Sequence, residues 1–191
     1  MKAIILLGTL KKTGLSNTET LAEFFADKLK QHGIDSEIIK LVEQPIYPGT
    51  YDHMGAGDAW PEILEKILSA NILIFATPIW WDNHSSEIQR VIERLDEVHD
   101  EIMAGAQSRL ANKVGGILIT GDSDGAQHII GNISNFLNAV GVLVPPFSTL
   151  SVLWEEQAKG VETSRAALIE EYESEYGETA EKMIAQLLKY A

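Results

Sequence analysis

The sequence predicts an α/β fold in which a doubly wound parallel sheet of five strands, in the order 2-1-3-4-5, carries helices on both faces. Short apolar runs alternate along the chain with stretches of helical periodicity, a pattern typical of β-α-β units with right-handed crossovers. The run at 72–77 is apolar without alternation, as in a strand buried on both faces of a parallel sheet. Five such runs favour the shorter of the two common strand orders.

The five predicted strands are apolar runs bounded by polar, Gly or Pro residues, namely Ala3–Leu7, Ser36–Ile39, Ile72–Thr77, Val114–Thr120 and Val142–Pro145. The predicted helices share an apolar stripe at helical spacing, and they are Asn17–Gln31, Pro61–Ser69, Ser86–Val98, Gly125–Val140 and Thr163–Tyr190, the last interrupted near Gly177. We expect residues 1–191 to form a single domain with a helical extension from about residue 155. The segment 43–60 is long for a connection, and such loops are typically functional or mobile.

Composition excludes several classes of function. The chain has 191 residues, of which 45% are hydrophobic, and no cysteine, so disulfides, thiolate metal sites and cysteine nucleophiles are ruled out. Its formal charge of −13 argues against a general nucleic-acid or anionic-membrane surface. The first residues predict a strand rather than a cleavable leader, and no segment approaches the roughly 18 apolar residues of a membrane span. We therefore expect a cytoplasmic protein without nucleic-acid or membrane partners.

The first predicted strand leads into residues 8–18, a loop that ends at the first helix. It carries several hydroxyl side chains and two lysines, and a helix start adds unpaired N–H groups with a favourable dipole. Helix capping by Ser16 or Asn17 is the alternative, but capping alone does not account for two lysines and so many hydroxyls in an acidic chain. Neither the Walker pattern nor the dinucleotide fingerprint is present, so we predict binding of a single terminal phosphate.

The third predicted strand stops at Pro78, which cannot extend the ladder, and an aromatic loop follows at the carboxyl edge of the sheet. Ligands of open α/β sheets bind at this edge. Two adjacent tryptophans, Trp80 and Trp81, are costly to expose unless something flat and apolar covers them, although they could instead cap the core. This loop predicts a contact with a planar ring.

The fourth predicted strand ends in the loop 120–125, which contains two glycines and two aspartates. Glycine lets a backbone approach a ligand closely, and Asp122 and Asp124 could accept hydrogen bonds from ring N–H groups or sugar-alcohol hydroxyls. A plain turn with helix capping is an alternative for either aspartate. A lone Asp-x-Asp is a weak metal signal, so we predict no metal site. The three loops together suit a ligand with a phosphate tail, a polar linker and a broad flat ring, which is the shape of flavin mononucleotide (FMN).

The same loops resemble those of the flavodoxin-like NAD(P)H-dependent FMN reductases, a family that includes quinone reductases. Residues 8–18 are similar to the family's Gly-Ser-Pro-Arg-Lys-x-Gly-x-Ser-x-Thr loop, and residues 76–88 to its Thr-Pro-Ile-Tyr-Trp-Gly segment. The resemblance implies that FMN phosphate binds at Thr9, Lys11, Ser16, Asn17 and Thr18. It implies further flavin contacts from Pro78, Ile79, Trp80, Trp81, Asp82, Asn83, Thr120, Gly121, Asp122 and Gly125.

The chain departs from the family pattern at several of these positions. Lys11 stands where arginine is usual, which keeps the charge but loses the bidentate fork. Asp82 replaces a glycine, and aspartate tolerates left-handed backbone better than most residues, so the turn is compatible with it.

The resemblance implies an enzyme that passes hydride from NADPH or NADH to FMN and then to a small-molecule acceptor such as a quinone or a flavin. It also implies a homodimer or homotetramer. No side chain is required as acid or base; His84 is a candidate proton donor, although a solvent-facing or capping role is the simpler interpretation. Trp154 could cover the substrate face of the flavin or pack in the core. The main alternative is a flavodoxin-type electron carrier, whose acidity would steer basic partners.

Overall fold

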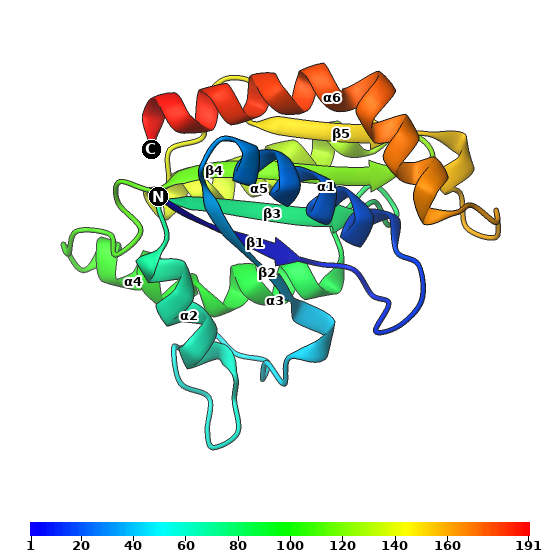
Figure 1. Cartoon of the computed structure of the whole chain (residues 1–191). Helices are drawn as coiled ribbons and strands as arrows, with labels where there is room; N and C mark the ends of the chain where they lie inside the picture. The colour runs from blue at the N-terminus through cyan, green and yellow to red at the C-terminus, as the bar shows by residue number, and fades with distance from the viewer.

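The computed structural model describes all 191 residues and contains a five-stranded parallel sheet in the order β2-β1-β3-β4-β5, which confirms the predicted fold class (Figure 1). The strands are β1 Lys2–Leu7, β2 Asp35–Lys40, β3 Ile72–Pro78, β4 Val114–Gly121 and β5 Thr149–Leu153. The α-helices are α1 Asn17–Gln31, α2 Trp60–Ser69, α3 Ser86–Arg94, α4 Asp96–Met103, α5 Ala126–Ala139 and α6 Arg165–Tyr190. Two short 3-10 helices complete the elements, η1 Leu41–Glu43 and η2 Glu155–Gln157.

Helices cover both faces of the sheet and enclose two separate apolar cores. Alternate residues of each strand point to opposite faces, so Ile4 and Phe75 pack in one core while Ile5 and Ile74 pack in the other. The first core is completed by α2, α3 and α5, and the second by α1 and α6. Figure 1 shows α1 and α6 together on one side of the sheet and α2 and α3 on the other. Because both faces are buried, the strands are apolar without alternation.

The predicted fifth strand, Val142–Pro145, is wrong. Leu143 makes only an isolated bridge to Val114, with its N–H donating to the Lys113 carbonyl at 2.9 Å. The chain then leaves the sheet at Pro145 and Pro146, which have no N–H to donate to a ladder, and β5 forms four residues later. The number of strands was therefore predicted correctly, but the fifth strand was assigned to the wrong residues.

Two predicted helices also differ in extent. The stretch 86–98 contains two helices, α3 and α4, because the backbone at Leu95 turns to φ −91° and ψ 3° between them. Conversely, α6 runs through Gly177 without a break. Gly177 is buried where α6 packs on α1, and a Cβ there would lie 3.3 Å from the Glu173 carboxylate. Tertiary packing thus offsets the cost of about 1 kcal/mol for glycine within a helix.

The long connection between β2 and α2 is anchored at its base by a buried ion pair. The guanidinium of Arg94 lies 2.7 Å from the Asp58 carboxylate, and both side chains are fully buried. Arg94 also donates to the carbonyls of Tyr47 at 2.8 Å, Tyr51 at 3.0 Å and Asp52 at 3.2 Å. One side chain from α3 therefore holds most of the segment 47–58 in place. None of the helices is long and apolar enough to cross a membrane.

Candidate functional site

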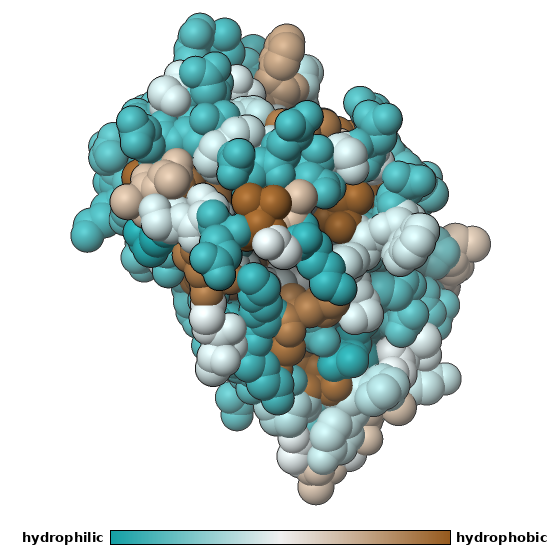
Figure 2. All heavy atoms as spheres, turned by 90° about the vertical axis from the view of Figure 1, so that its right-hand side faces the viewer, coloured by the Kyte–Doolittle hydropathy of each residue, from teal (hydrophilic) through white to brown (hydrophobic).

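A cavity of about 1050 Å³ opens at the carboxyl edge of the sheet, where the loops after β1, β3 and β4 meet. Figure 2 shows this side of the molecule, with apolar side chains exposed among hydrophilic ones. From the three predicted loops, the cavity is lined by Thr9, Leu10, Lys11, Leu15, Ser16, Asn17, Thr18, Pro78, Ile79, Trp80, Trp81, Asp82, Thr120, Gly121, Asp122, Ser123 and Asp124. A fourth wall is formed by residues 156–163, which follow β5. The sheet topology therefore brings together all but two of the predicted site residues, Asn83 and Gly125.

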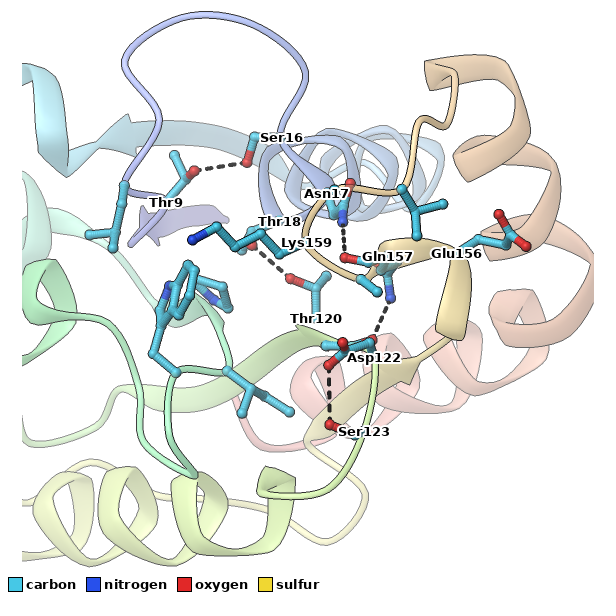
Figure 3. A pocket seen from close by; sticks show the side chains of 18 of the residues that line it. Thr9, Ser16, Asn17, Thr18, Thr120, Asp122, Ser123, Glu156, Gln157 and Lys159 are labelled. Carbon is cyan, nitrogen blue, oxygen red and sulfur yellow. Dashed lines mark hydrogen bonds between the residues drawn. The ribbon is translucent and has the colours of Figure 1, made fainter.

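Four buried hydroxyl groups form two hydrogen-bonded pairs at the end of the cavity nearest α1 (Figure 3). The hydroxyls of Thr9 and Ser16 are 2.8 Å apart, and those of Thr18 and Thr120 are 2.7 Å apart. Ser16 is also the N-cap of α1 and accepts from the Glu19 N–H at 3.3 Å. Each pair uses one hydroxyl hydrogen for its own bond, so the other remains free to donate. Capping and anion binding are therefore compatible at this helix start.

The two remaining predicted phosphate ligands are partly engaged within the protein. The ammonium of Lys11 donates to the Leu15 carbonyl at 2.7 Å and closes the loop over itself. The side-chain amide of Asn17 donates to the Gln157 carbonyl at 3.2 Å. Lys11 keeps two further donors, since an ammonium carries three. The loop after β1 is thus closed by its own contacts, with its charge at the exposed rim.

The aromatic loop after β3 is a two-residue hairpin turn. The backbones of Trp80 and Asn83 exchange hydrogen bonds of 2.8 and 2.9 Å, and the two residues between them have positive φ, 50° at Trp81 and 61° at Asp82. This is the geometry of a type I′ turn, for which Asn-Gly is the usual sequence. Left-handed backbone costs a non-glycine residue about 1–2 kcal/mol. Aspartate in place of glycine therefore preserves the turn at a cost in strain.

This turn presents one tryptophan to solvent and uses the predicted Asn83 for its own structure. Trp81 is 93% exposed and Trp80 is 40% exposed, and both line the cavity. Asn83 does not line it, because its side-chain amide donates to the Trp81 carbonyl at 3.2 Å. A nearly fully exposed tryptophan on strained backbone is unusual, and strained backbone of this kind concentrates at functional sites.

The two glycines of the loop after β4 allow close packing between the loops that follow β3 and β4. A Cβ on Gly121 would lie 2.6 Å from Ile79 Cδ1, and one on Gly125 would lie 2.9 Å from Asp82 Cα. Gly125 has φ 114° and is the N-cap of α5 instead of its first helical residue. It does not line the cavity, so the sequence prediction of a ligand contact there differs from its place in the structure.

The wall formed by residues 156–163 is the main feature that the sequence analysis missed. From the sequence, these residues were expected only within a helical extension from about residue 155. In a parallel sheet the loop after every strand lies at the same edge, so the correct position of β5 would have predicted this wall. Placing the fifth strand too early concealed it.

Gln157 anchors this wall to the rest of the site. Its amide donates to the carbonyls of Gly121 at 3.0 Å and Val152 at 3.1 Å, and its side-chain oxygen accepts from the Tyr172 hydroxyl at 2.9 Å. The Tyr172 hydroxyl also lies 3.2 Å from the Asn17 carbonyl. Burial raises the pKa of Tyr172 far above its usual value, so the hydroxyl stays protonated. One buried network therefore joins β4, β5, α6, the start of α1 and the wall.

Two aromatic or titratable candidates lie outside the cavity lining. Trp154 packs partly buried against the core that α6 covers, and its backbone N–H donates to the Gly121 carbonyl at 3.0 Å. His84 lies at the start of α3 with its Nδ1 3.3 Å from the Ser85 carbonyl oxygen. Neither residue lines the cavity.

The cavity has one hydroxyl-lined end and one aromatic end. Comparison with known proteins shows the family of the chain. The profile of the family described as NADPH-dependent FMN reductase matches residues 1–153. The chain belongs to this family. The prediction of a family of FMN-dependent NAD(P)H oxidoreductases is thereby confirmed, and the electron-carrier alternative is not favoured.

The chain is also similar to individual proteins. The chain is 36% identical over 157 residues to the 8-demethyl-8-aminoriboflavin-5'-phosphate synthase of Streptomyces davaonensis, covering 76% of this chain and 61% of that protein. It is 32% identical over 151 residues to the divalent metal cation transporter MntH of Mycobacterium bovis, covering 76% of this chain and 22% of that protein. The chain therefore spans about three fifths of the first relative and about a fifth of the second.

A solved structure extends the likeness over the full length of the chain. The crystal structure of RosB with bound 8-demethyl-8-formylriboflavin-5'-phosphate superposes with a TM-score of 0.80 at 28% identity, covering 100% of this chain and 78% of that one. That protein therefore holds a flavin phosphate on the same fold.

Proposed function

We propose that this chain binds FMN in the cavity at the carboxyl edge of the sheet and uses it to transfer hydride from NAD(P)H to a small-molecule acceptor such as a quinone or a flavin. The observation that carries the proposal is the division of one cavity into a hydroxyl-lined end at the start of α1 and an aromatic end at the turn 80–83. A phosphate tail fits the first end, and a planar ring fits the second.

The residues present fit FMN on their chemistry. The start of α1 offers free hydroxyl donors from the Thr9–Ser16 and Thr18–Thr120 pairs, together with unpaired backbone N–H groups. FMN, when bound, supplies the hydride chemistry, and the protein supplies position and electrostatics. The roles we assign to the chain are therefore binding and orientation, with no side chain acting as acid or base.

The size of the cavity supports a second ligand beside the flavin. Sites for single drug-sized ligands have volumes of about 300–1,000 Å³, and this cavity is slightly larger, with about 1050 Å³. Trp81, exposed at the rim, is placed to stack on a second ring and exclude water from it. This arrangement is what hydride transfer between two planar molecules requires.

The test is to mix purified protein with FMN, remove unbound flavin by gel filtration, and add NADPH without oxygen while the visible spectrum is followed. Retained flavin that loses its absorbance promptly on addition of NADPH or NADH supports the proposal. Retained flavin that neither nucleotide bleaches would contradict hydride transfer, and failure to retain flavin would contradict the cofactor site itself.

A second candidate function is that the flavin phosphate is the substrate rather than a resident cofactor. The observation that favours it is the likeness to the two flavin-phosphate proteins described above, which extends over the whole chain in the RosB structure. Mass spectrometry of the flavin after incubation with NAD(P)H and small-molecule acceptors separates the two, because a cofactor is recovered unchanged whereas a substrate changes mass.

We also infer a homodimer or homotetramer that acts in the cytoplasm, where NAD(P)H is found. The support is the exposure of Trp81, Leu10 and Leu153 near the cavity, which a second copy could cover. Light scattering on the purified protein measures the mass directly, and a monomer at micromolar concentration would contradict this inference.

A further inference from the structure

The wall 156–163 lies beyond the residues that match the family, yet it faces the end of the cavity where we place the phosphate. Its position is set by buried contacts: the Gln157 side chain bonds to β4, β5 and α6, and its backbone carbonyl accepts from Asn17 at the start of α1. The wall is therefore held at the helix start rather than free in solvent.

Lys159 extends from this wall into the cavity. Figure 3 shows its side chain reaching inward on the side of Thr9 and Thr18, whereas the neighbouring Glu156 points away. None of the ion pairs in the structure includes Lys159. In a chain of net charge −13, an unpaired ammonium directed into a cavity has a position that suits an anionic ligand.

The charges around the cavity show why such a group is needed. Only two cationic side chains line it, Lys11 and Lys159. The lining also includes five carboxylates, which are Asp82, Asp122, Asp124, Glu156 and Glu162. A phosphate monoester carries between one and two negative charges at neutral pH, so these carboxylates would repel it. Lys11 already donates to the Leu15 carbonyl, which leaves Lys159 as the cation without a protein partner.

We propose that Lys159 is a phosphate ligand of the FMN site, and that the wall 156–163 closes the phosphate end of the cavity over the helix start. The inference rests on the proposed function, because it assumes that FMN is the ligand. It assigns this chain a second phosphate-binding cation, contributed by a segment outside the family-matched region. A charge-assisted hydrogen bond from an ammonium to phosphate is stronger than a neutral one, so its loss is measurable.

The test compares two ligands that differ only in the phosphate. FMN and riboflavin are titrated by flavin fluorescence against the full-length protein and against Lys159→Gln. We expect the Kd for FMN to rise about tenfold in the variant and the Kd for riboflavin to stay unchanged. Lys159→Arg, which keeps the charge, restores FMN binding, and Lys30→Gln, which removes the same charge at the far end of α1, changes neither Kd.

Three outcomes would overturn the assignment. Equal weakening of FMN and riboflavin would mean that Lys159 only supports the wall. Unchanged binding of both ligands would mean that it does not reach the phosphate. A higher KM for NADPH with unchanged FMN binding would place it against the second substrate. If the unmodified protein binds neither flavin, the proposed function fails instead, so the two failures are distinguishable.

Discussion

Two glycine-containing connections of this protein, 8–16 and 44–59, could both be interpreted as functional loops from their sequences. Their polar groups are arranged differently. In 44–59, Arg94 is buried and donates to the carbonyls around it, and its charge is matched by Asp58. In 8–16, polar groups pair with each other at the edge of a cavity and keep donors free. The loop 44–59 is therefore anchored by one buried side chain that binds its backbone carbonyls, whereas the loop 8–16 keeps hydroxyl donors available at a cavity and is the candidate for binding.

The largest expected effect tests the structural side of this comparison. Replacing Arg94 with methionine leaves the buried Asp58 carboxylate without its cationic partner, so we expect a loss of about 3–5 kcal/mol in the free energy of unfolding. Urea denaturation followed by circular dichroism measures it. The matched control is Arg109→Met, which removes partly exposed ion pairs with Asp52 and Glu101 and should cost about 1 kcal/mol or less. Equal losses in the two variants would contradict the contrast between a fully buried and a partly exposed ion pair.

The second prediction concerns the contact between the loops after β3 and β4. Gly125→Ala places a Cβ 2.9 Å from Asp82 Cα at φ 114°, so we expect a loss of about 2–3 kcal/mol in stability and weaker FMN binding. Gly131→Ala is the control, because Gly131 lies in α5 with open space around it. That change should stabilise the protein by about 0.5–1 kcal/mol and leave FMN binding unchanged. An equally stable Gly125→Ala variant would show that the loops are free to separate.

The third prediction concerns the anchoring of the cavity wall. Tyr172→Phe removes the hydroxyl that bonds to Gln157 at 2.9 Å, and we expect about 1–2 kcal/mol lower stability because a buried acceptor loses its partner. FMN affinity should fall as well, since the wall is then less ordered. Tyr176→Phe removes only a 3.4 Å contact to the Leu153 carbonyl and should have little effect on either quantity. Thermal melting with and without FMN measures both quantities. Unchanged FMN binding in Tyr172→Phe would show that the anchoring of the wall does not affect the FMN site.

The smallest expected effect is the response to acid. Burial alone would raise the pKa of Asp58, but hydrogen bonds from the Tyr47 N–H, the Arg94 guanidinium and the Trp60 N–H together hold it below its usual value. A carboxyl group whose pKa is lowered on folding stabilises the protein above its unfolded pKa, and that contribution is lost as pH falls through the folded pKa. We therefore expect stability to decline below about pH 4. A carboxyl-detected NMR titration checks this, and an Asp58 pKa at or above the usual value would contradict the buried pair.

Much of the site was predictable because the carboxyl ends of parallel strands must meet at one edge. The apolar runs for β1, β3 and β4 were recognised correctly, so the loops that follow them were placed at that edge. The wall 156–163 was not recognised, because the apolar run at 142–145 was assigned to the fifth strand. In the structure this run makes only an isolated bridge to Val114 and forms no strand. Asn83 and Gly125 were predicted as ligand contacts. In the structure the Asn83 side chain bonds within the turn, and Gly125 packs against the loop after β3.

The sequence by itself determined the strand order, the family and the chemical character of each loop, because periodicity, turn residues and short motifs are local properties of the chain. Only the tertiary structure decided which polar groups are satisfied. The pairing of Arg94 with Asp58, the network around Gln157 and the direction of Lys159 all join residues that are distant in sequence. Hydrogen bonds and ion pairs act over a few ångströms, so their partners are known only once the packing of the sheet and helices has brought those segments together.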